Sequence, residues 1–493
     1  MMRPMQEFSL RLSEAAELIG ASTPHSDLRF TGITHVDSEI EPGDIFCAIP
    51  GAKVHGAEFI DSAKKRGAVA VITDEAGSQK NSGLPMLVVK DVRGASAIVA
   101  ASLYQSPTRD LVTIGVTGTN GKTTVTTLLY QLCSLAGRDS GLIGTVETRI
   151  SNERIKSVRT TPEATDLQAL LAVMRERHLR NVVMEVSSHA LAMGRMKGSH
   201  FSLVAFTNLT QDHLDFHKDM DSYFAAKSML FTREFADAAF INIDNEYGRK
   251  LAATTPLSVT TVSRTNTSAD WHYASLDSDA HGITFAIRGT GGILIESTSS
   301  LVGGYNADNV LLAVALATEI GIDPIEIASL TPRLAGAAGR LESVSLGQPY
   351  RALVDYAHSP DAVESVLATA REFTSGKIIA VLGCGGDRDS AKRPLMGNAL
   401  NHGADIAIFT SDNPRSEQPE AILQQMTSGL DIAQPSKIIV DRAEAISYAV
   451  SCAQEGDCIL ILGKGHEQGQ EINGSVHAFD DRQVLAHAIE ARS

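Results

Sequence analysis

The chain has 493 residues, of which 43% are hydrophobic and 5% aromatic, as is typical of a globular protein of about three domains. Its 43 lysines and arginines stand against 58 aspartates and glutamates. The formal charge of −15 argues against nucleic acid or an anionic membrane as the main partner. The five cysteines show no metal-binding spacing, and neither a long apolar run nor a signal-peptide core is present. We therefore expect a cytoplasmic protein with reduced thiols.

Residues 1–105 are expected to form a small α/β domain, which ends at a linker around Ser106-Pro107-Thr108. Its predicted elements are a helix at 13–19, strands at 33–36 and 44–49, a helix at 60–66, and strands at 68–72 and 86–89.

A second domain, predicted over residues 106–334, opens with a phosphate-binding loop. A buried strand is predicted at 111–116 and a helix at 123–136, and between them lie Gly118, Thr119, Asn120, Gly121, Lys122, Thr123 and Thr124. In such a loop the backbone N–H groups surround phosphate oxygens, the lysine reaches the β- and γ-phosphates, and a threonine hydroxyl can hold Mg²⁺. The glycine spacing is not the usual one, so an ordinary turn is the alternative here.

The rest of this domain alternates short apolar runs with helical stretches, which indicates a mostly parallel sheet with helices on both faces. The predicted elements are strands at 181–186, 203–207 and 239–243 and a helix at 309–321. The segment 257–300, rich in threonine, serine and glycine, is expected to be an antiparallel insert or edge.

Polar residues near the ends of these strands could carry chemistry. Glu185 ends the strand at 181–186, where its carboxylate can ligate Mg²⁺; capping of the next helix is the alternative. His213 and His217 have the spacing of a zinc site but lack a glutamate between them, so a single histidine facing the phosphates is favoured. Lys227, by itself, is expected to be a surface lysine whose stem lies along apolar surface.

Residues 335–493 alternate strand and helix again and predict a Rossmann-like domain. Its predicted elements are strands at 352–356, 378–382, 406–410, 438–440 and 458–462 and helices at 361–372, 395–401, 419–428 and 443–452. Polar loops at 355–360, 412–415 and 463–467 follow strand ends, so we expect them to converge at one edge of the sheet. Arg393 and Arg415 have planar guanidinium groups, each of which can bind a carboxylate through two hydrogen bonds.

A series of motifs spreads, in order, over nearly the whole chain. They are Gly118–Thr124, Glu185–His189, Asn208 with Asp212-His213, Tyr223-Phe224 with Lys227, Asn242 with Asp244, Tyr305-Asn306 with Asn309, Gly339-Arg340 with Glu342, Asp355–His358 and Gly463–Glu467. On these motifs the chain resembles the Mur ligase family, whose own phosphate loop has this glycine spacing. The overall expectation is an α/β protein of three domains, with a central phosphate-loop domain and a C-terminal Rossmann-like domain.

Within the family the chain most resembles the members that add the third residue of the peptidoglycan stem peptide. The resemblance implies that the γ-phosphoryl group of ATP passes to the D-glutamate γ-carboxylate of UDP-MurNAc-L-Ala-D-Glu. An amine then attacks the acyl phosphate, and phosphate leaves. The implied ATP-binding residues are Gly118, Thr119, Asn120, Gly121, Lys122, Thr123, Thr124, Asn306, Asn309, Arg340, Asp355 and His358.

The resemblance also implies the catalytic and metal sites. Lys122 and Mg²⁺ would neutralise charge, with Thr123 and Glu185 around the first metal and His213 at the second. Lys227 would carry a carbamate derived from CO₂ and serve the second metal. Because carbamylation needs a neutral amine, Lys227 should be partly desolvated.

For the UDP-sugar dipeptide, the family pattern points to Ser38, Thr160, Thr161, Ser187 and Arg195. Met193 and Glu39 depart from that pattern.

The amino-acid site is implied to consist of Arg393, Asp412, Asn413, Pro414, Arg415, Gly463 and Glu467. The run Asp412–Arg415 resembles the form found in members that add meso-diaminopimelate, and L-lysine is the alternative substrate. Arg415 and Arg393 could bind carboxylates of diaminopimelate, while Asp412 and Glu467 accept hydrogen bonds from ammonium groups.

Two other functions stay open. A folylpolyglutamate synthase shares the core architecture, and a nucleotide-dependent switch would use the same phosphate loop. The expected partners are the small-molecule substrates alone, with no nucleic acid and no membrane, and the chain is expected to be a monomer.

Overall fold

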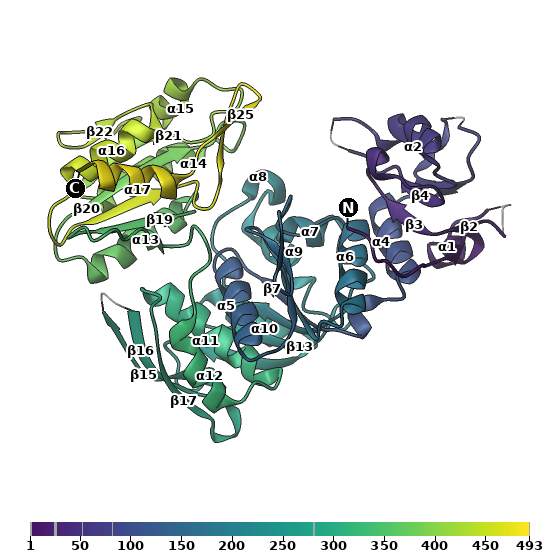
Figure 1. Ribbon diagram of the computed structural model, residues 1–493, viewed down its shortest axis with the longest axis horizontal. Helices are drawn as coiled ribbons and strands as arrows, with labels where there is room; N and C mark the ends of the chain where they lie inside the picture. The colour runs from purple at the N-terminus through teal and green to yellow at the C-terminus, as the bar shows by residue number, and fades with distance from the viewer. Residues whose placement is uncertain (1, 24–26, 52, 81, 280–281, 493) are drawn as a thin grey trace.

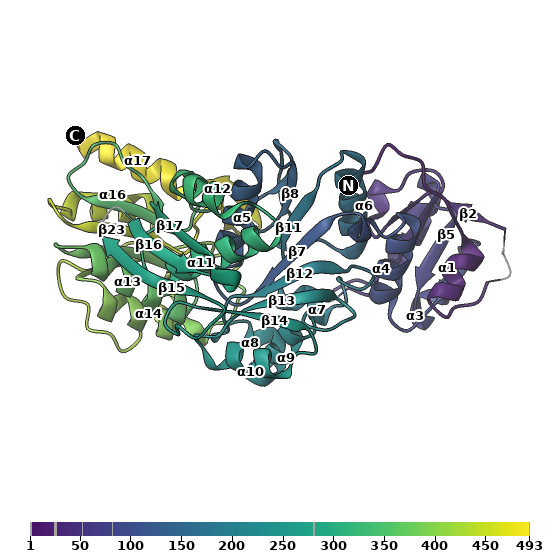
Figure 2. The same ribbon diagram turned by 90° about the horizontal axis from the view of Figure 1, so that it is seen from below.

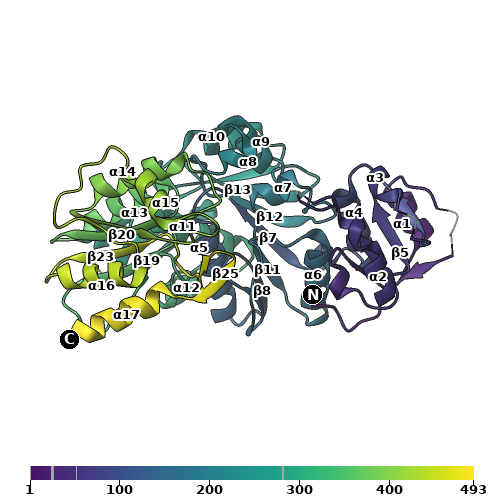
Figure 3. The same cartoon turned by 90° about the horizontal axis from the view of Figure 1, so that it is seen from above.

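The computed structural model describes residues 2–23, 27–51, 53–80, 82–279 and 282–492. Met1 and Ser493, the outer ends of the first and last predicted domains, lie outside the described residues. The three largest sheets have four, eleven and six strands. They follow one another along an elongated molecule, with the N-terminal sheet at one end and the C-terminal sheet at the other (Figures 1, 2 and 3). The predicted α/β class is confirmed.

The N-terminal unit is built on the parallel sheet β3-β4-β5-β6. Its strands are β1 (Leu10–Arg11), β2 (Arg29–Phe30), β3 (Gly32–Thr34), β4 (Asp44–Cys47), β5 (Ala70–Thr73) and β6 (Met86–Val88). Its helices are α1 (Leu12–Leu18), η1 (Asp37–Glu39), η2 (Gly56–Phe59), α2 (Ile60–Arg66), α3 (Glu75–Ser78), α4 (Val92–Leu103) and η3 (Pro107–Arg109). Each predicted element of this unit is present. The sequence patterns missed α4, which packs against α6 of the next unit.

The central sheet has the order β10-β9-β8-β11-β7-β12-β13-β14-β15-β16-β17. Its strands are β7 (Val112–Thr117), β8 (Ser140–Ile143), β9 (Thr148–Ile150), β10 (Glu153–Ile155), β11 (Asn181–Glu185), β12 (Phe201–Phe206), β13 (Ala236–Asn242), β14 (Ser258–Ser263), β15 (Trp271–Asp279), β16 (Gly282–Arg288) and β17 (Leu294–Ser299). The strands from β8 to β15 in this order are parallel, and the pairs at both edges are antiparallel. The predicted antiparallel edge at 257–300 is therefore confirmed from β15 onward, whereas β14 still belongs to the parallel part.

The central helices are α5 (Lys122–Leu135), α6 (Ala164–Glu176), α7 (Ser188–Ala192), α8 (Leu214–His217), α9 (Met220–Ser228), α10 (Glu246–Thr254), η4 (Thr290–Gly292), α11 (Gly304–Glu319), α12 (Pro324–Leu330) and η5 (Thr331–Arg333). In the strand order, β7 lies between β11 and β12. Because all three are parallel, the segments that follow them meet at one edge of the sheet.

The C-terminal sheet has the order β18-β19-β23-β20-β21-β22, and β24 pairs with β25 in a separate hairpin. Its strands are β18 (Glu342–Ser343), β19 (Arg351–Asp355), β20 (Ile378–Cys384), β21 (Ile406–Ser411), β22 (Lys437–Ile438), β23 (Cys458–Leu462), β24 (Gly469–Ile472) and β25 (Ser475–Ala478). Its helices are α13 (Pro360–Phe373), α14 (Lys392–Gly403), α15 (Pro419–Met426), α16 (Arg442–Cys452) and α17 (Asp481–Arg492). From β19 to β22 the strands are parallel, as predicted, but the hairpin and α17 were not predicted.

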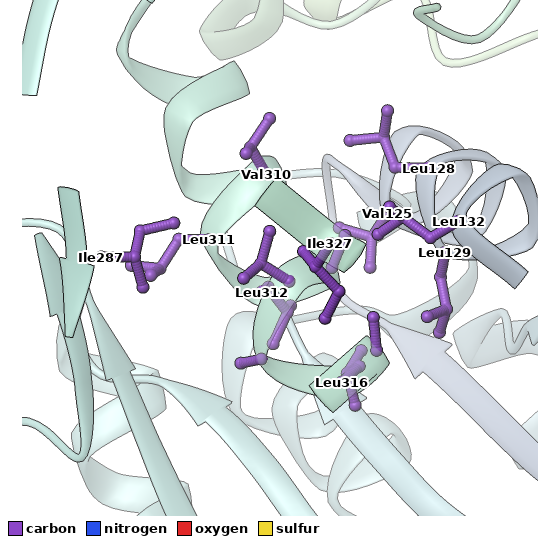
Figure 4. Close-up of a cluster of buried hydrophobic side chains, with 14 of the residues drawn as sticks. Val125, Leu128, Leu129, Leu132, Ile287, Val310, Leu311, Leu312, Leu316 and Ile327 are labelled. Carbon is purple, nitrogen blue, oxygen red and sulfur yellow. The ribbon is translucent and has the colours of Figure 1, made fainter. Parts of the chain in front are cut away.

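The core of the central unit anchors the phosphate loop. Apolar side chains recur at helical spacing on α5 and α11, and the two helices pack against each other and the sheet (Figure 4). Leu128 and Leu132 of α5 and Leu312 and Leu316 of α11 are all at most 1% exposed. Burying such a side chain contributes about 1.5–3 kcal/mol, so this packing holds the N-terminus of α5 in place.

Among the described residues, no helix is both long and apolar enough to span a membrane. The five cysteines are unpaired, and all but Cys452 are buried.

Candidate active site

The phosphate loop joins β7 to α5, and its backbone conformation explains its glycines. Gly118 has φ +150° and Gly121 φ +86°, a region that favours glycine. The neighbouring strand end holds the loop, because the Thr207 hydroxyl donates to the Asn120 carbonyl (2.6 Å) and the Asn120 N–H donates to Asn208 Oδ1 (2.9 Å). The N-terminus of α5 thus opens onto a preformed turn, as an anion site requires.

Two lysines converge on this loop. Lys122 Nζ donates to the carbonyls of Gly118 and Thr119 (both 2.9 Å), and Lys227 Nζ donates to the same Gly118 carbonyl (2.7 Å). Lys227 also lies over the ring of Tyr223, 4.7 Å from its centroid. It is only 1% exposed, so the prediction of a surface lysine was wrong: α9 packs against α7 and α8, and Lys227 is buried there. Burial and the nearby Lys122 charge lower the pKa of Lys227 well below its usual value.

Glu185 ends β11 and is 1% exposed. Its carboxylate accepts hydrogen bonds from the Thr123 hydroxyl (2.9 Å) and from the backbone N–H and hydroxyl of Thr145 (2.7 and 3.0 Å). A carboxylate and a hydroxyl oxygen this close are the hard ligands that Mg²⁺ prefers. Thr145 was not predicted, because it lies in a loop with no recognisable motif.

His213 has a left-handed backbone at the start of α8, and its Nε2 lies 3.4 Å from Asp212 Oδ2. Its ring contacts that of His189, with centroids 4.8 Å apart. Burial lowers the pKa of His213 to about 4, so the ring is neutral and able to bind a metal near neutral pH. His217 instead points into the core toward the Ser188 hydroxyl (2.9 Å), which removes it from a shared zinc site.

Thr161, Ser187 and Arg195 gather beside Glu185. The Thr161 hydroxyl donates to the Glu185 backbone carbonyl (2.9 Å) and lies 3.3 Å from the Ser187 hydroxyl. Arg195 pairs with Glu163 (2.9 Å), a buried carboxylate that also pairs with Arg93 of α4 (3.3 Å). This side of the central sheet is therefore connected to the N-terminal unit.

The other two predicted positions, Thr160 and Ser38, and the departing residue Met193 differ in their surroundings. The Thr160 hydroxyl oxygen lies 3.0 Å from that of Thr145, next to Glu185. Ser38 is exposed in η1 of the N-terminal unit. The Met193 sulfur lies 3.5 Å from Arg195 Nη2, so this departure from the family pattern sits directly at the site.

The loops of the C-terminal unit converge as predicted. Asn413 Nδ2 donates to Glu467 Oε2 (2.8 Å), and Lys464 Nζ donates to Asn413 Oδ1 (3.0 Å) and Glu467 Oε2 (3.2 Å). Asp412 Oδ2 would lie 2.8 Å from a Cβ placed on Gly463, so the loops touch. Burial raises the pKa of Asp412, and the positive charge of Lys464 is the largest effect in the opposite direction. Lys464, 0% exposed, was missed because its partner Asn413 is distant in sequence.

Arg393 is 1% exposed, and both terminal nitrogens of its guanidinium are already hydrogen-bonded, whereas Nε has no partner among the described residues. It binds Glu417 through two hydrogen bonds (2.7 and 2.8 Å), and it donates to Gln425 Oε1 (2.8 Å) and the Gly385 carbonyl (3.1 Å). These bonds use all four terminal N–H groups, so a ligand carboxylate would have to displace a protein partner.

Arg415 and Arg388 both lie beside Gly385, where an added Cβ would be 3.0 Å from Arg415 Nη1 and 3.7 Å from Arg388 Cγ. Arg415 donates to the Gly386 carbonyl (2.7 Å) and pairs with Glu471 (3.2 Å), and the Pro414 that precedes it is buried. Arg388 is exposed, and its guanidinium has no partner among the residues that the structure describes. Arg388 was not predicted, because no local sequence pattern distinguishes it from Arg393.

The two predicted asparagines of α11 lie above the phosphate loop. Asn309 Nδ2 donates to Asn306 Oδ1 (3.3 Å), and Asn309 Oδ1 would lie only 2.4 Å from a Cβ on Gly121. A glycine is therefore needed at position 121 for contact as well as conformation.

In the C-terminal unit, the guanidinium of Arg340 stacks on the ring of Tyr356, 4.9 Å from its centroid. The buried Asp355 accepts from the N–H groups of Leu341 (2.7 Å) and Ala357 (2.8 Å), which fixes the segment that carries Arg340. His358 Nδ1 lies 2.7 Å from the Tyr356 carbonyl, so the second ring nitrogen is left for another partner.

A cleft of about 1730 Å³ separates the central and C-terminal units. Thr123, Glu185 and Asn306 line one wall, and Arg340, Asn413, Arg415 and Glu467 line the other. Two of its lining side chains, Arg340 and His466, carry a buried nitrogen without a hydrogen-bond partner among the described residues, at Nε and Nδ1 respectively. Such nitrogens fit a polar ligand in the cleft.

Family models match the chain in three consecutive segments. They are the Mur ligase family catalytic domain at residues 29–104, the Mur ligase middle domain at 116–317 and the Mur ligase glutamate ligase domain at 339–465.

Curated relatives match over nearly the full length. The UDP-N-acetylmuramoyl-L-alanyl-D-glutamate--2,6-diaminopimelate ligase of Streptomyces coelicolor is 48% identical over 99% of this chain and 98% of its own. The ligase of the same name from Corynebacterium glutamicum is 43% identical over 90% of this chain and 89% of its own.

Solved structures are similar to this chain over nearly its full length. A ligase with that same name has a TM-score of 0.69 at 34% identity, covering 98% of this chain and 99% of its own. MurF from Acinetobacter baumannii is similar in fold alone, with a TM-score of 0.68 at 14% identity, covering 99% of this chain and 100% of its own.

Proposed function

The chain belongs to the Mur ligase family, and from this we propose that it joins meso-2,6-diaminopimelate to UDP-MurNAc-L-Ala-D-Glu with consumption of ATP. The observation that carries the proposal is that a phosphate loop and the Asp412–Arg415 loop face one cleft. The first can hold ATP, and the second can hold a diamino acid. The relatives named for this reaction match both parts of the chain.

The reaction would proceed by two displacements. A D-glutamate carboxylate oxygen bonds to the γ-phosphorus of ATP, and ADP leaves. The free amine of diaminopimelate then attacks the acyl carbon, the bond from that carbon to the phosphate oxygen breaks, and the amine loses a proton to give the amide. Lys122 and the N–H groups at the start of α5 would stabilise the negative charge that develops on the phosphoryl oxygens.

The donor set beside the phosphate loop fits Mg²⁺, which when bound neutralises phosphate charge. Thr123 and Glu185 would hold one ion, and His213 with Lys227 a second. For this Lys227 must become a carboxylate: its neutral amine bonds to the carbon of CO₂ and releases a proton. The lowered pKa of Lys227 supports that step, because burial favours the uncharged amine.

The amino acid would be selected in the C-terminal unit. Asp412 and Glu467 accept hydrogen bonds from ammonium groups, and Arg415 binds a carboxylate. Since Arg393 is occupied by Glu417, we assign the further carboxylate contact to Arg388 and give Arg393 the role of holding the loop. L-Lysine lacks the second carboxylate, so it would leave an arginine unpaired and be rejected by roughly 10⁴-fold.

ATP and a UDP-linked substrate are consumed, so we place the protein in the cytoplasm, with small molecules as its partners. Thr160, Thr161, Ser187 and Arg195 would bind the UDP-sugar dipeptide from the central unit, and Ser38 from the N-terminal unit.

The test supplies protein, ATP, Mg²⁺ and UDP-MurNAc-L-Ala-D-Glu with either meso-diaminopimelate or L-lysine, and follows phosphate release and product mass. Product with diaminopimelate alone is expected. Product with lysine alone would keep the ligase but overturn the assigned amino acid, and no product with either would overturn the ligase.

A further inference from the structure

A buried ion pair lies beneath the proposed amino-acid site and is not part of it. Arg442, the first residue of α16, and Asp481, the first residue of α17, both have fully buried side chains. Arg442 Nε donates to Asp481 Oδ1 (2.7 Å), and Nη2 donates to Asp481 Oδ2 (2.7 Å). The pairing is therefore bidentate and planar, as only an arginine can make it.

The remaining hydrogen bonds of Arg442 go to the ends of two strands. Nη2 donates to the carbonyl of Leu462 (2.9 Å), the last residue of β23, and Nη1 donates to the carbonyl of Ser411 (3.3 Å), the last residue of β21. The next residues along the chain are Gly463 and Asp412, where the two loops of the amino-acid site begin. One guanidinium thus joins the origins of both loops.

The two strands are not neighbours, because β20 lies between them in the sheet. Each pairs with β20, up to Ser411 and Leu462, so backbone pairing sets the spacing of the strands but not of the loops that continue beyond them. Arg442 spans the end of β20, and Asp481 holds the guanidinium in the orientation that reaches both carbonyls.

Stability by itself is a weak reason for such a pair. Removing two charges from water is costly, and well-packed apolar residues often replace a buried ion pair without loss of stability. The guanidinium of Arg442 donates to two backbone carbonyls at once, which an apolar side chain cannot do.

We propose that Arg442 and Asp481 are positioning residues, which set the distance between the 412–415 and 463–467 loops so that both contact one diamino acid. This inference rests on the proposed function, because it names what holds that same site in shape. Neither residue would touch the substrate; both would act through the loops that do.

The test compares three variants in the ligase assay. Arg442→Lys keeps the positive charge but lacks the guanidinium, and Asp481→Asn removes the negative charge. The double variant Arg442→Met with Asp481→Leu replaces the pair by apolar side chains. In each we expect the KM for diaminopimelate to rise at least about tenfold, with the KM for ATP within about twofold of wild type. Asp405→Asn is the matched control, because Asp405 pairs with Arg371 at the opposite end of β21, and it should leave both constants unchanged.

The double variant separates positioning from folding. It should recover the thermal unfolding midpoint of wild type while its KM for diaminopimelate stays raised. A folded double variant, or a folded Arg442→Lys, with a wild-type KM for diaminopimelate would overturn the inference. Wild-type protein that makes no product would instead overturn the proposed function, so the two failures are distinguishable.

Discussion

Lys227 lies where a neutral amine is favoured: it is buried, shares the Gly118 carbonyl with Lys122 and lies over Tyr223. We expect Lys227→Ala to lower kcat by about a hundredfold or more, because the proposed ligand for a second Mg²⁺ would be lost. Added acetate should restore part of the activity by supplying a carboxylate.

The matched control is Lys250→Ala, which removes an exposed lysine from the nearby helix α10. It should keep its activity and gain nothing from acetate. A carbamate signal from ¹³C-labelled bicarbonate, present in wild type and absent in Lys227→Ala, would identify the modified residue. Full turnover in Lys227→Ala would remove the residue from the mechanism.

The Glu417 carboxylate shows how one side chain links loop geometry to pH. Its hydrogen bonds to Arg393 lower its pKa from 4.5 to about 2. Since the folded-state pKa lies below the unfolded value, the stabilisation is complete above pH 4.5 and is lost as the pH falls toward 2.

Glu417→Gln should therefore lower the thermal unfolding midpoint most above pH 4.5, and the difference from wild type should shrink as the pH falls toward 2. Glu420→Gln removes the same charge from an exposed position nearby and serves as the control. If Glu417→Gln lowers the thermal unfolding midpoint by the same amount at every pH, the ion pair with Arg393 is not the cause.

At the scale of elements, the strand–loop–helix unit around Gly118 depends on close backbone contact. A Cβ on Gly118 would lie 1.9 Å from the Thr207 hydroxyl oxygen and 3.0 Å from the Asn208 carbonyl oxygen. Gly118→Ala should displace the loop and raise the KM for ATP by about a hundredfold.

Gly137→Ala is the matched control for this substitution. Gly137 ends the same helix with φ +69° but has no atom within 4 Å of an added Cβ. It should cost about 1 kcal/mol of stability and leave the KM for ATP unchanged. If both variants bind ATP like wild type, the contact between the loop and β12 is not required.

The elements themselves were largely predictable, because β-branched runs, helical periodicity and glycine stops are local signals. The predictions left out the helices α4, α6 and α17 and the strands from β8 to β10. Two of these helices have partners that only the fold reveals: α4 packs against α6, and α17 docks through Asp481 onto Arg442.

For the whole molecule, the proposed ATP ligands come from two units on opposite walls of the cleft. In the proposed site one ATP would contact Lys122 and Arg340 together, so binding should close the cleft. We expect small-angle X-ray scattering to show a smaller radius of gyration with a non-hydrolysable ATP analogue, the UDP-dipeptide and diaminopimelate. The mass should remain that of a 52.5 kDa monomer.

Lys122→Ala, which loses the phosphate contact, should show no compaction with the same ligands. An unchanged radius in wild type at saturating ligand would contradict closure, and a doubled mass would contradict the monomer.

The amino-acid sequence by itself determined the fold class, the phosphate loop and the edge of each sheet that carries polar residues. These depend on neighbours along the chain, and the carboxyl ends of parallel strands meet by topology. Only the tertiary structure decided that Lys227 is buried, that Arg393 is occupied by Glu417, and that Arg442 joins two loop origins. Burial and pairing depend on groups brought together from distant segments, and no local pattern records those partners.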